Sequence, residues 1–111
     1  MPTTLSAVTM NSADPQRTAA FWAALLDGTC HEGGNGYVHV RGGALLLIVQ
    51  RSPARQAALA PDVHLDLTTD DRAHEVARAV ALGASVVDER WDTHGAWTVL
   101  HDPDGREFCL A

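Results

Sequence analysis

The fold of this chain follows from one stretch near its middle, Val63-His64-Leu65-Asp66-Leu67-Thr68-Thr69-Asp70-Asp71. Its first residues alternate apolar side chains with an imidazole, a carboxylate and a hydroxyl, which is the period-two pattern of a β-strand with two different faces. The apolar face needs a core, and the polar face either meets solvent or lines a cavity. We therefore predict a strand over residues 63–68, with His64, Asp66 and Thr68 on one face.

A helix and three further strands are predicted after this strand. Asp70 or Asp71 supplies the N-cap of the helix, and Leu82-Gly83 ends it. One apolar stripe runs along the helix through Ala73, Val76, Ala77 and Val80. The strands are expected over residues 84–90, 96–101 and 107–110, and the last two are joined by the turn Asp102-Pro103-Asp104-Gly105, in which glycine takes the strained dihedral.

The first half of the chain shows the same order of elements. We predict a strand over residues 5–10 and a helix over 14–27, with Asp14 as N-cap, Pro15 at the first helical position and Gly28 as a left-handed C-terminal cap. Phe21 and Trp22 lie in the helix stripe and are expected in the core. Glycine-rich turns then separate strands predicted over residues 29–32, 37–41 and 44–50.

This repetition is an internal duplication. An offset of 57 residues places Asp14 on Asp71 and brings the two predicted helices into register. We expect one domain over residues 1–111, made of a first module over 5–50, a linker over 51–61 and a second module over 62–111.

Composition and charge exclude several classes of function. Apolar residues make up 46% of the chain and charged residues 20%, as in an ordinary globular protein. The net charge of −6 and the absence of a basic stripe argue against a nucleic-acid partner, because phosphate neutralisation supplies most of that affinity.

No apolar run approaches the roughly 20 residues that span a bilayer, and Met1-Pro2-Thr3-Thr4 does not open a signal peptide, so a cytoplasmic location without a membrane partner is expected. Cys30 and Cys109 have no metal-binding or redox spacing and are expected to be reduced thiols.

The duplication, the helix segment Asp14-Pro15 through Leu26, and the ending Val99-Leu100-His101-Asp102-Pro103-Asp104-Gly105-Arg106-Glu107-Phe108-Cys109-Leu110 resemble the vicinal oxygen chelate superfamily. Within it, the chain resembles the glyoxalase-like domains, which are related to glyoxalase I, the bleomycin resistance proteins and the extradiol dioxygenases. The resemblance implies an α+β fold of two tandem βαβββ modules, whose curved mixed sheet surrounds a cavity while the helices pack outside. It also implies a homodimer, and it implies that His64, Asp66 and Thr68 face the cavity.

In metal-dependent members of this superfamily, the first and last strands of each module provide ligands to a divalent ion, usually His, Glu or Gln. Carried onto this chain, those positions fall on Ala7, Gln50, His64 and Cys109, with Glu107 two residues earlier on the last strand. Alanine cannot bind a metal, so the set is incomplete. A site for Ni, Zn, Mn or Fe with His64, Gln50 and Cys109 as ligands is the alternative to a protein without metal.

Each candidate side chain also has a simpler interpretation. His64 is a candidate metal ligand, general base or hydrogen-bonded cavity residue. Asp66 lies about 7 Å along the strand from His64 and is a candidate general base or the partner of an arginine. Glu107 is a candidate catalytic carboxylate or a strand-edge charge, and Cys109 is a candidate soft ligand or nucleophile or a buried apolar filler. Trp91 and Trp97 flank the loop over residues 92–95, a candidate lid, and either sandwich a planar ligand or pack on the sheet.

Two classes of function follow from these residues. The first is a small-molecule binding protein of the bleomycin-resistance kind, which holds a metabolite or antibiotic against His64, Asp66, Gln50, Trp91, Trp97 and Cys109 without chemistry. The second is a lyase, isomerase or dioxygenase, with or without a metal, that uses His64, Asp66 or Glu107 in catalysis. The incomplete ligand set favours binding, and fold analogy alone does not decide between the two.

Overall fold

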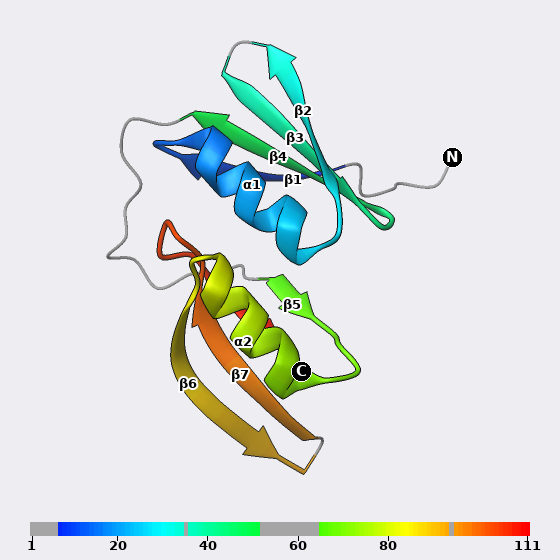
Figure 1. The fold of residues 1–111 in the computed structure, drawn as a ribbon, viewed down its shortest axis with the longest axis vertical. Coiled ribbons are helices and arrows are strands. Elements are labelled where there is room, and N and C mark those ends of the chain that lie inside the picture. Colours follow the sequence, from blue (N-terminus) through cyan, green and yellow to red (C-terminus); the bar gives the residue numbers. More distant parts are fainter. Residues whose placement is uncertain (1–6, 35, 52–64, 94) are drawn as a thin grey trace. The chain divides into compact units, whose positions relative to one another are not determined.

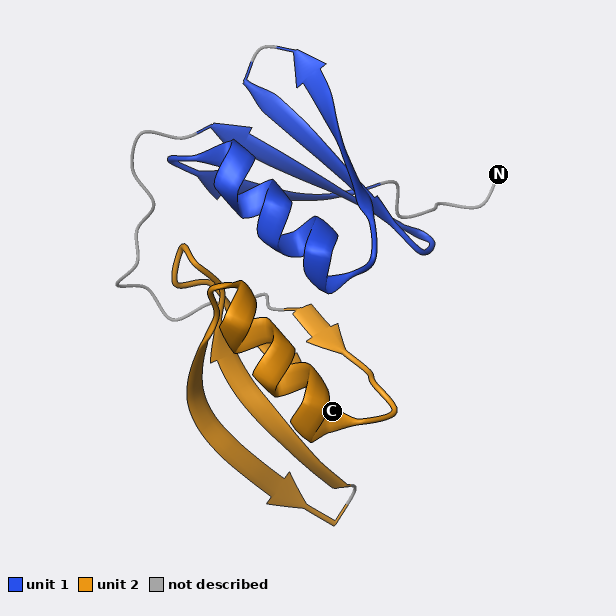
Figure 2. Cartoon of the chain, in the orientation of Figure 1, with its two compact units in different colours: residues 1–55 blue, residues 56–111 orange. Residues whose placement is uncertain are grey.

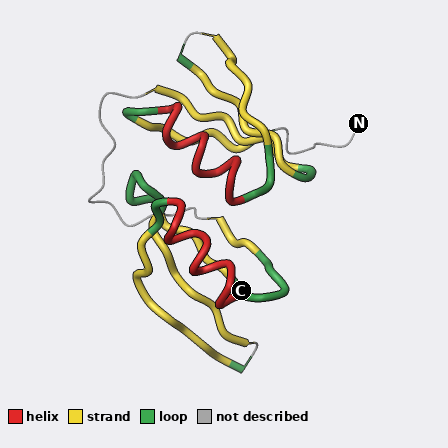
Figure 3. Tube along the Cα trace, in the orientation of Figure 1, coloured by secondary structure: helices red, strands yellow, loops and turns green. Residues whose placement is uncertain are grey.

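The computed structural model describes residues 7–34, 36–51, 65–93 and 95–111. The chain divides into two compact units, residues 1–55 and residues 56–111, which are coloured separately in Figure 2. Each unit contains one helix and four strands among its described residues, as Figure 3 shows. The predicted α+β class and the tandem βαβββ modules are therefore confirmed.

The first unit is a four-stranded mixed sheet with one helix. Its strands lie in the order β1-β4-β3-β2, with β1 parallel to β4 and the other pairs antiparallel (Figure 1). The elements are β1 (Val8–Ser12), α1 (Pro15–Leu25), β2 (Thr29–Gly34), β3 (Tyr37–Gly42) and β4 (Leu45–Arg51).

The second unit repeats this plan. Its strands lie in the order β5-β8-β7-β6, with β5 parallel to β8 and the other pairs antiparallel. The elements are β5 (Leu65–Leu67), α2 (Arg72–Leu82), β6 (Ser85–Asp92), β7 (Gly95–His101) and β8 (Glu107–Leu110). Neither helix of the described chain is long and apolar enough to cross a membrane.

The two helices begin through the same chemistry at equivalent positions. The carboxylate of Asp14 accepts a hydrogen bond from the Arg17 backbone N–H at 3.2 Å, and the carboxylate of Asp71 accepts one from the His74 N–H at 3.1 Å. Pro15 occupies the start of α1, where its missing N–H leaves no hydrogen bond unmade. Asp71 rather than Asp70 is the cap of α2, and the offset of 57 residues relates the two helices end to end.

The two helices end differently at their C-termini, and the predicted left-handed cap at Gly28 was wrong. Gly83 ends α2 with φ at 121°, as predicted. In the first unit the left-handed residue is Asp27, with φ at 54°, and not Gly28. Gly28 is needed for a different reason, since a Cβ at that position would lie 2.3 Å from the carbonyl oxygen of Arg41. The glycine therefore permits the close approach of the chain to β3.

The core of the first unit forms where α1 covers one face of its sheet. Phe21 and Trp22 are 4% and 1% exposed, as predicted, and their rings meet edge to face at 5.3 Å. Opposite them, every second residue of β3 and β4 is buried, namely Val38, Val40, Leu47 and Val49. Burying roughly 200 Å² of one aromatic side chain stabilises the fold by about 5 kcal/mol before the loss of conformational entropy is subtracted.

Helix α2 does not bury the stripe predicted for it. Of that stripe only Val76 is partly buried, whereas Ala73, Ala77 and Val80 are exposed, and Ala79 is the residue of α2 that is fully buried. Arg72 in the first turn forms an ion pair at 3.3 Å with Glu89 of β6. Arg72, Val76 and Ala79, spaced by four and three residues, therefore lie on the side of the helix nearest the sheet.

Strand boundaries shift slightly from the prediction. β1 begins at Val8 and ends at Ser12, because its parallel pairing with β4 runs from Val8 opposite Leu47 to Ser12 opposite Arg51. Arg51 is consequently a strand residue rather than the start of the linker. The predicted linker from residue 52 onward, and the strand residues Val63 and His64, lie outside the described residues.

The turn before β8 is held by a buried carboxylate. Asp102 accepts hydrogen bonds from the backbone N–H of Asp104 at 3.0 Å and of Arg106 at 2.8 Å, and it forms an ion pair with the Arg106 guanidinium. Gly105 takes a φ of 79°, as the Asp-Pro-Asp-Gly pattern predicts. This turn leads directly into β8, which carries Glu107 and Cys109.

Candidate functional site

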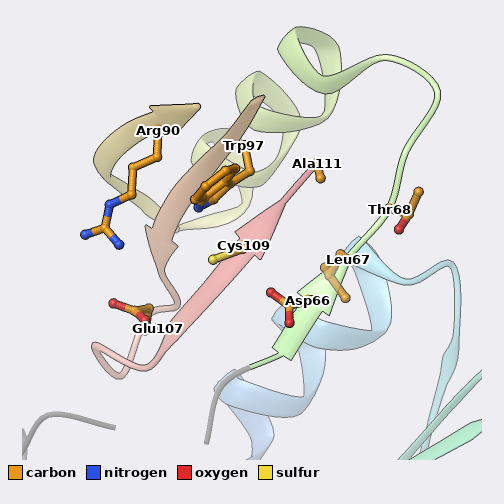
Figure 4. Close-up of a pocket in the computed structure, with 8 residues that line it drawn as sticks. All are labelled: Asp66, Leu67, Thr68, Arg90, Trp97, Glu107, Cys109 and Ala111. Atoms are coloured by element: carbon orange, nitrogen blue, oxygen red, sulfur yellow. The ribbon is translucent and has the colours of Figure 1, made fainter. Parts of the chain in front are cut away.

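A hollow of about 420 Å³ lies on the second unit, on the face of the sheet opposite α2. Strand β5 and the residues after it, together with β6, β7 and β8, contribute its lining, which Figure 4 shows. The lining residues are Asp66, Leu67, Thr68, Arg90, Trp97, Glu107, Cys109 and Ala111.

The pairing of the strands explains why these side chains converge. Asp66 on β5 pairs with Cys109 on β8, and Trp97 on β7 pairs with Arg90 on β6. Glu107 and Cys109 are two residues apart and so point to the same side of β8. The alternate residues Phe108 and Leu110 are buried on the other side.

The thiol of Cys109 lies at the centre of the labelled residues in Figure 4 and is 8% exposed. Burial raises its pKa above the ordinary value of 9.0, and the negative charges of Asp66 and Glu107 raise it further. Asp66 is also hydrogen-bonded to the thiol, which favours the protonated form. These effects favour the protonated thiol over the thiolate, which is the nucleophilic form of cysteine.

The charges of the hollow are mixed. Asp66 and Glu107 are carboxylates, and Arg90 provides a guanidinium. Arg90 binds Asp88 on its own strand at 3.0 Å, and the hydrogen bond from Arg90 lowers the pKa of the Asp88 carboxyl. Because the lining holds two carboxylates and one guanidinium, it carries a net negative charge at neutral pH.

The two tryptophans of the hairpin lie close together. Trp91 and Trp97 line a second hollow of about 290 Å³ beside Arg90, and Trp91 is 78% exposed. Asp92 pairs with Gly95, so β6 and β7 are joined through only two residues. Asp92 and Gly95, which were predicted to belong to a loop, are paired strand residues of β6 and β7.

The structure brings together four of the predicted site residues, Asp66, Trp97, Glu107 and Cys109, and places Trp91 beside them. Gln50 belongs to the first unit, where its amide donates a hydrogen bond to the Asn11 side chain at 3.2 Å. His64 lies outside the described residues.

Arg90 and Leu67 line the hollow without having been predicted as site residues. For Arg90 the only signal in the sequence is its place on a strand beside Trp91. A bulge between Val86 and Asp88 shifts the register of β6 against β7, and that shift decides which of its side chains face the hollow.

The resemblance implies a divalent metal ion, which needs several ligand side chains close together. Within residues 7–34, 36–51, 65–93 and 95–111, no three His, Cys, Asp or Glu side chains are grouped so that they could hold a metal ion. Cys109 stands where the resemblance implies a carboxylate, so this position offers a sulfur and not an oxygen ligand. The described donors of this hollow do not fit a hard divalent ion, which prefers several charged oxygen ligands.

Comparison with known proteins identifies relatives of the whole chain. Residues 7–111 match the family model of the glyoxalase-like domain. No curated protein sequence matches the chain.

Solved structures share its fold at low sequence identity. The fosfomycin resistance protein FosX from Listeria monocytogenes, an E126Q mutant in complex with Mn(II) and 1S,2S-dihydroxypropylphosphonic acid, has a TM-score of 0.81 and 19% identity over 99% of this chain and 90% of that chain. A glyoxalase/bleomycin resistance protein/dioxygenase family enzyme from Burkholderia phytofirmans has a TM-score of 0.78 and 17% identity over 95% of this chain and 94% of that chain. A hypothetical protein from S. aureus has a TM-score of 0.76 and 15% identity over 99% of this chain and 93% of that chain. The match over residues 7–111 shows that this chain belongs to the glyoxalase-like domain family.

Proposed function

We propose that this chain is a small-molecule binding protein of the glyoxalase and bleomycin-resistance type, and that the hollow of the second unit holds its ligand. The observation that carries the proposal is the convergence of Trp97, Asp66, Glu107 and Arg90 on one concave surface. A volume of about 420 Å³ lies within the range of about 300–1,000 Å³ that is common for small-molecule sites.

The lining supports a metabolite or antibiotic with an apolar planar part and polar substituents. Trp97 offers a ring face for stacking, and the two carboxylates accept hydrogen bonds from hydroxyl or amino groups. Arg90 and Thr68 can donate to oxygen atoms of the ligand. A ligand that lacks these polar groups would leave the carboxylates desolvated without partners, which costs binding free energy.

Binding without chemistry is supported by the state of Cys109. Burial and the charges of Asp66 and Glu107 raise the pKa of the Cys109 thiol, which disfavours the nucleophilic thiolate, and its sulfur does not supply the carboxylate oxygens that the metal-dependent relatives provide. Asp66 and Glu107 orient a ligand in this proposal and transfer no proton.

The alternative is an enzyme of the same superfamily. FosX from Listeria monocytogenes is described with Mn(II) and a dihydroxypropylphosphonic acid, so a divalent ion belongs to the chemistry of a protein with this fold. In this chain such an ion would require His64, with Gln50 and Cys109 as further ligands. Asp66 or Glu107 would then be the general base.

One experiment separates the two functions. The chelator-treated protein is incubated with Ni²⁺, Zn²⁺, Mn²⁺ or Fe²⁺ in turn, and metal content is measured beside His64→Ala. We expect no metal that depends on His64. In parallel, tryptophan fluorescence is titrated with a panel of planar metabolites and antibiotics, and we expect a ligand whose affinity falls at least about tenfold in Trp97→Phe.

Trp22→Phe serves as the matched control, since Trp22 is 1% exposed in the other unit and does not line the hollow. Near-stoichiometric metal that is lost in His64→Ala would overturn the binding proposal and favour the enzyme. A ligand bound equally well by the parent and by Trp97→Phe would show that this hollow is not the binding site.

We also propose that the chain forms a homodimer, as the resemblance implies, and that it lies in the cytoplasm. Both cysteines among the described residues are free, Cys30 exposed and Cys109 buried, which suits a reducing compartment. Sedimentation equilibrium of the full chain tests the dimer, and a species with the monomer mass of 11.9 kDa at micromolar concentration would contradict it.

A further inference from the structure

The hollow of the second unit is lined by more negative than positive side chains. Asp66 and Glu107 contribute two carboxylates, and Arg90 contributes one guanidinium. Arg90 is also engaged by Asp88 of its own strand, whose carboxylate lies 3.0 Å from Nε of Arg90. A ligand that enters the hollow removes water from the two carboxylates, and a positively charged group offsets that loss of hydration best.

The two carboxylates are close to the same thiol. Asp66 is hydrogen-bonded to Cys109, and the charge of Glu107 also acts on that sulfur. Asp66 pairs with Cys109 across β5 and β8, and Glu107 is two residues from Cys109 on β8. Figure 4 shows Asp66 and Glu107 on two sides of Cys109 in this hollow. A single cationic group beside the thiol is therefore attracted by both charges.

Trp97 gives the hollow an aromatic wall. Its ring lines the hollow together with the two carboxylates and is partly buried. The next residue, Thr98, is 1% exposed on the other face of the sheet, so strand alternation directs Trp97 to the side of the hollow. The face of an indole ring attracts cations more strongly than other aromatic side chains do, and it also stacks on planar groups. A planar cation suits both the ring and the carboxylates.

The distribution of charge along the chain favours the same class of ligand. Residues 56–111 hold eleven of the fourteen acidic residues and four of the eight arginines, whereas residues 1–55 hold three acidic residues and four arginines. The second unit therefore carries nearly all of the negative charge of the protein. A field of this sign raises the local concentration of cations and lowers that of anions.

On the basis of the proposed function of this hollow, we infer that its ligand is an organic cation, in which a planar aromatic ring carries an ammonium, amidinium or guanidinium group. The ring stacks on Trp97, and the cationic group lies between Asp66 and Glu107. Arg90 and Thr68 remain available for oxygen atoms elsewhere on the ligand.

Three probes of one shape test the charge of the ligand. Benzamidinium, benzamide and benzoate share a ring and a small planar substituent, and they carry a positive charge, no charge and a negative charge. Each is titrated into the ¹⁵N-labelled full chain at about pH 8, where histidine side chains are ordinarily neutral. Amide chemical shifts give both the affinity and the place of binding. We expect benzamidinium to bind about tenfold more tightly than benzamide, since two partly exposed ion pairs contribute about threefold each, and benzoate to bind most weakly.

Variants assign this preference to the two carboxylates. Asp66→Asn and Glu107→Gln each remove one charge and keep the shape of the side chain, and we expect each to lower benzamidinium affinity about threefold without changing benzamide affinity. Glu75→Gln is the matched control, because it removes the same charge from α2, on the face of the sheet opposite the hollow, and we expect a change of less than about twofold. Thermal unfolding of each variant should match the parent within a few degrees.

The outcomes separate this inference from the proposed function on which it rests. Equal affinities for benzamidinium and benzamide, both weakened in Trp97→Phe, would overturn the cationic ligand and leave the hollow as a binding site. Tighter binding of benzoate would also overturn it, as would a benzamidinium affinity unchanged in both carboxylate variants or no benzamidinium binding at millimolar concentration. The proposed function fails as well only if the metabolite and antibiotic panel yields no ligand that depends on Trp97.

Discussion

Replacing Asp102 removes the group that fixes the entry of the chain into β8. The side chain of Asp102 is fully buried, and it accepts two backbone hydrogen bonds in addition to its ion pair with Arg106, whose side chain is 16% exposed. Truncation to alanine leaves two buried backbone N–H groups without their acceptor and also removes the ion pair, so that Arg106 keeps only its contact with Asp104 at 3.5 Å, and together these losses cost about 3–5 kcal/mol. We expect Asp102→Ala to lower the free energy of unfolding by that amount.

The conservative variant separates the hydrogen bonds from the charge. Asp102→Asn keeps an oxygen that can accept from the backbone N–H groups of Asp104 and Arg106, and it loses the ion pair. We expect it to cost about 1–2 kcal/mol, since hydrogen bonds that are retained keep most of the turn in place. Urea unfolding followed by far-ultraviolet circular dichroism measures both values, with Asp70→Ala as an exposed control expected within about 0.5 kcal/mol of the parent.

Two results would refute this account of the turn. If Asp102→Ala cost less than about 1 kcal/mol, the buried carboxylate would not hold the turn. If Asp102→Asn cost as much as Asp102→Ala, the charge alone would matter and the two backbone hydrogen bonds would contribute nothing. Since β8 begins at Glu107, the same variants should also weaken ligand binding at Trp97 in proportion to their loss of stability.

Further predictions concern the caps, a glycine and the thiols. Asp71→Ala should lower the free energy of unfolding by about 1 kcal/mol through loss of the N-cap, and an equal effect in Asp70→Ala by urea unfolding would contradict the assignment of the cap. Gly28→Ala should be destabilising by more than 1 kcal/mol, because its Cβ would lie 2.3 Å from a backbone oxygen, and an unchanged thermal midpoint would contradict that reason. Cys30 is exposed and should react with a thiol reagent faster than Cys109 in the native protein; equal native rates, followed by mass spectrometry, would argue against the burial of Cys109.

The raised pKa of Cys109 also makes the free energy of unfolding depend on pH. The unfolded thiol loses its proton near its ordinary pKa of 9.0, whereas the folded thiol keeps it to higher pH. The contribution of this thiol to the free energy of unfolding is fully present below pH 9. It is lost as the pH rises through the pKa of the thiol in the folded protein. Cys109→Ala should therefore flatten the loss of stability above pH 9, measured by urea unfolding at several pH values, and an unchanged slope would contradict the shift.

Local chemistry made much of this fold predictable. Asp14 and Asp71 as caps, Pro15 at a helix start and the Asp-Pro-Asp-Gly turn act over a few residues, so the sequence shows them directly. The strand at 107–110 was predicted with its observed bounds for the same reason, because the turn defines where it begins.

Features that depend on long-range pairing were not predictable in this way. The neighbours of Cys109 are set by its pairing with Asp66, which is far away in sequence, and the place of Arg90 depends on the register shift in β6. The prediction of the buried face of α2 was wrong because that face is set by packing against the sheet, where Ala79 is buried and Arg72 lies beside Glu89 of β6. In each case a contact between distant residues outweighed the local pattern.

The duplicated scaffold carries different chemistry in its two copies, and the strand registers show where they differ. One row crosses the first sheet through Thr9, Ile48, His39 and His31, and the equivalent row crosses the second sheet through Asp66, Cys109, Val99 and Asp88. In the second sheet the polar groups gather at the parallel pair β5 and β8, where the proposed ligand site lies. In the first sheet, the parallel pair β1 and β4 holds Thr9 beside Ile48. His39 and His31 lie on the antiparallel strands β3 and β2. Because the backbone plan is the same, side-chain replacement along one row is sufficient to give the two sheets different polar groups on the same face.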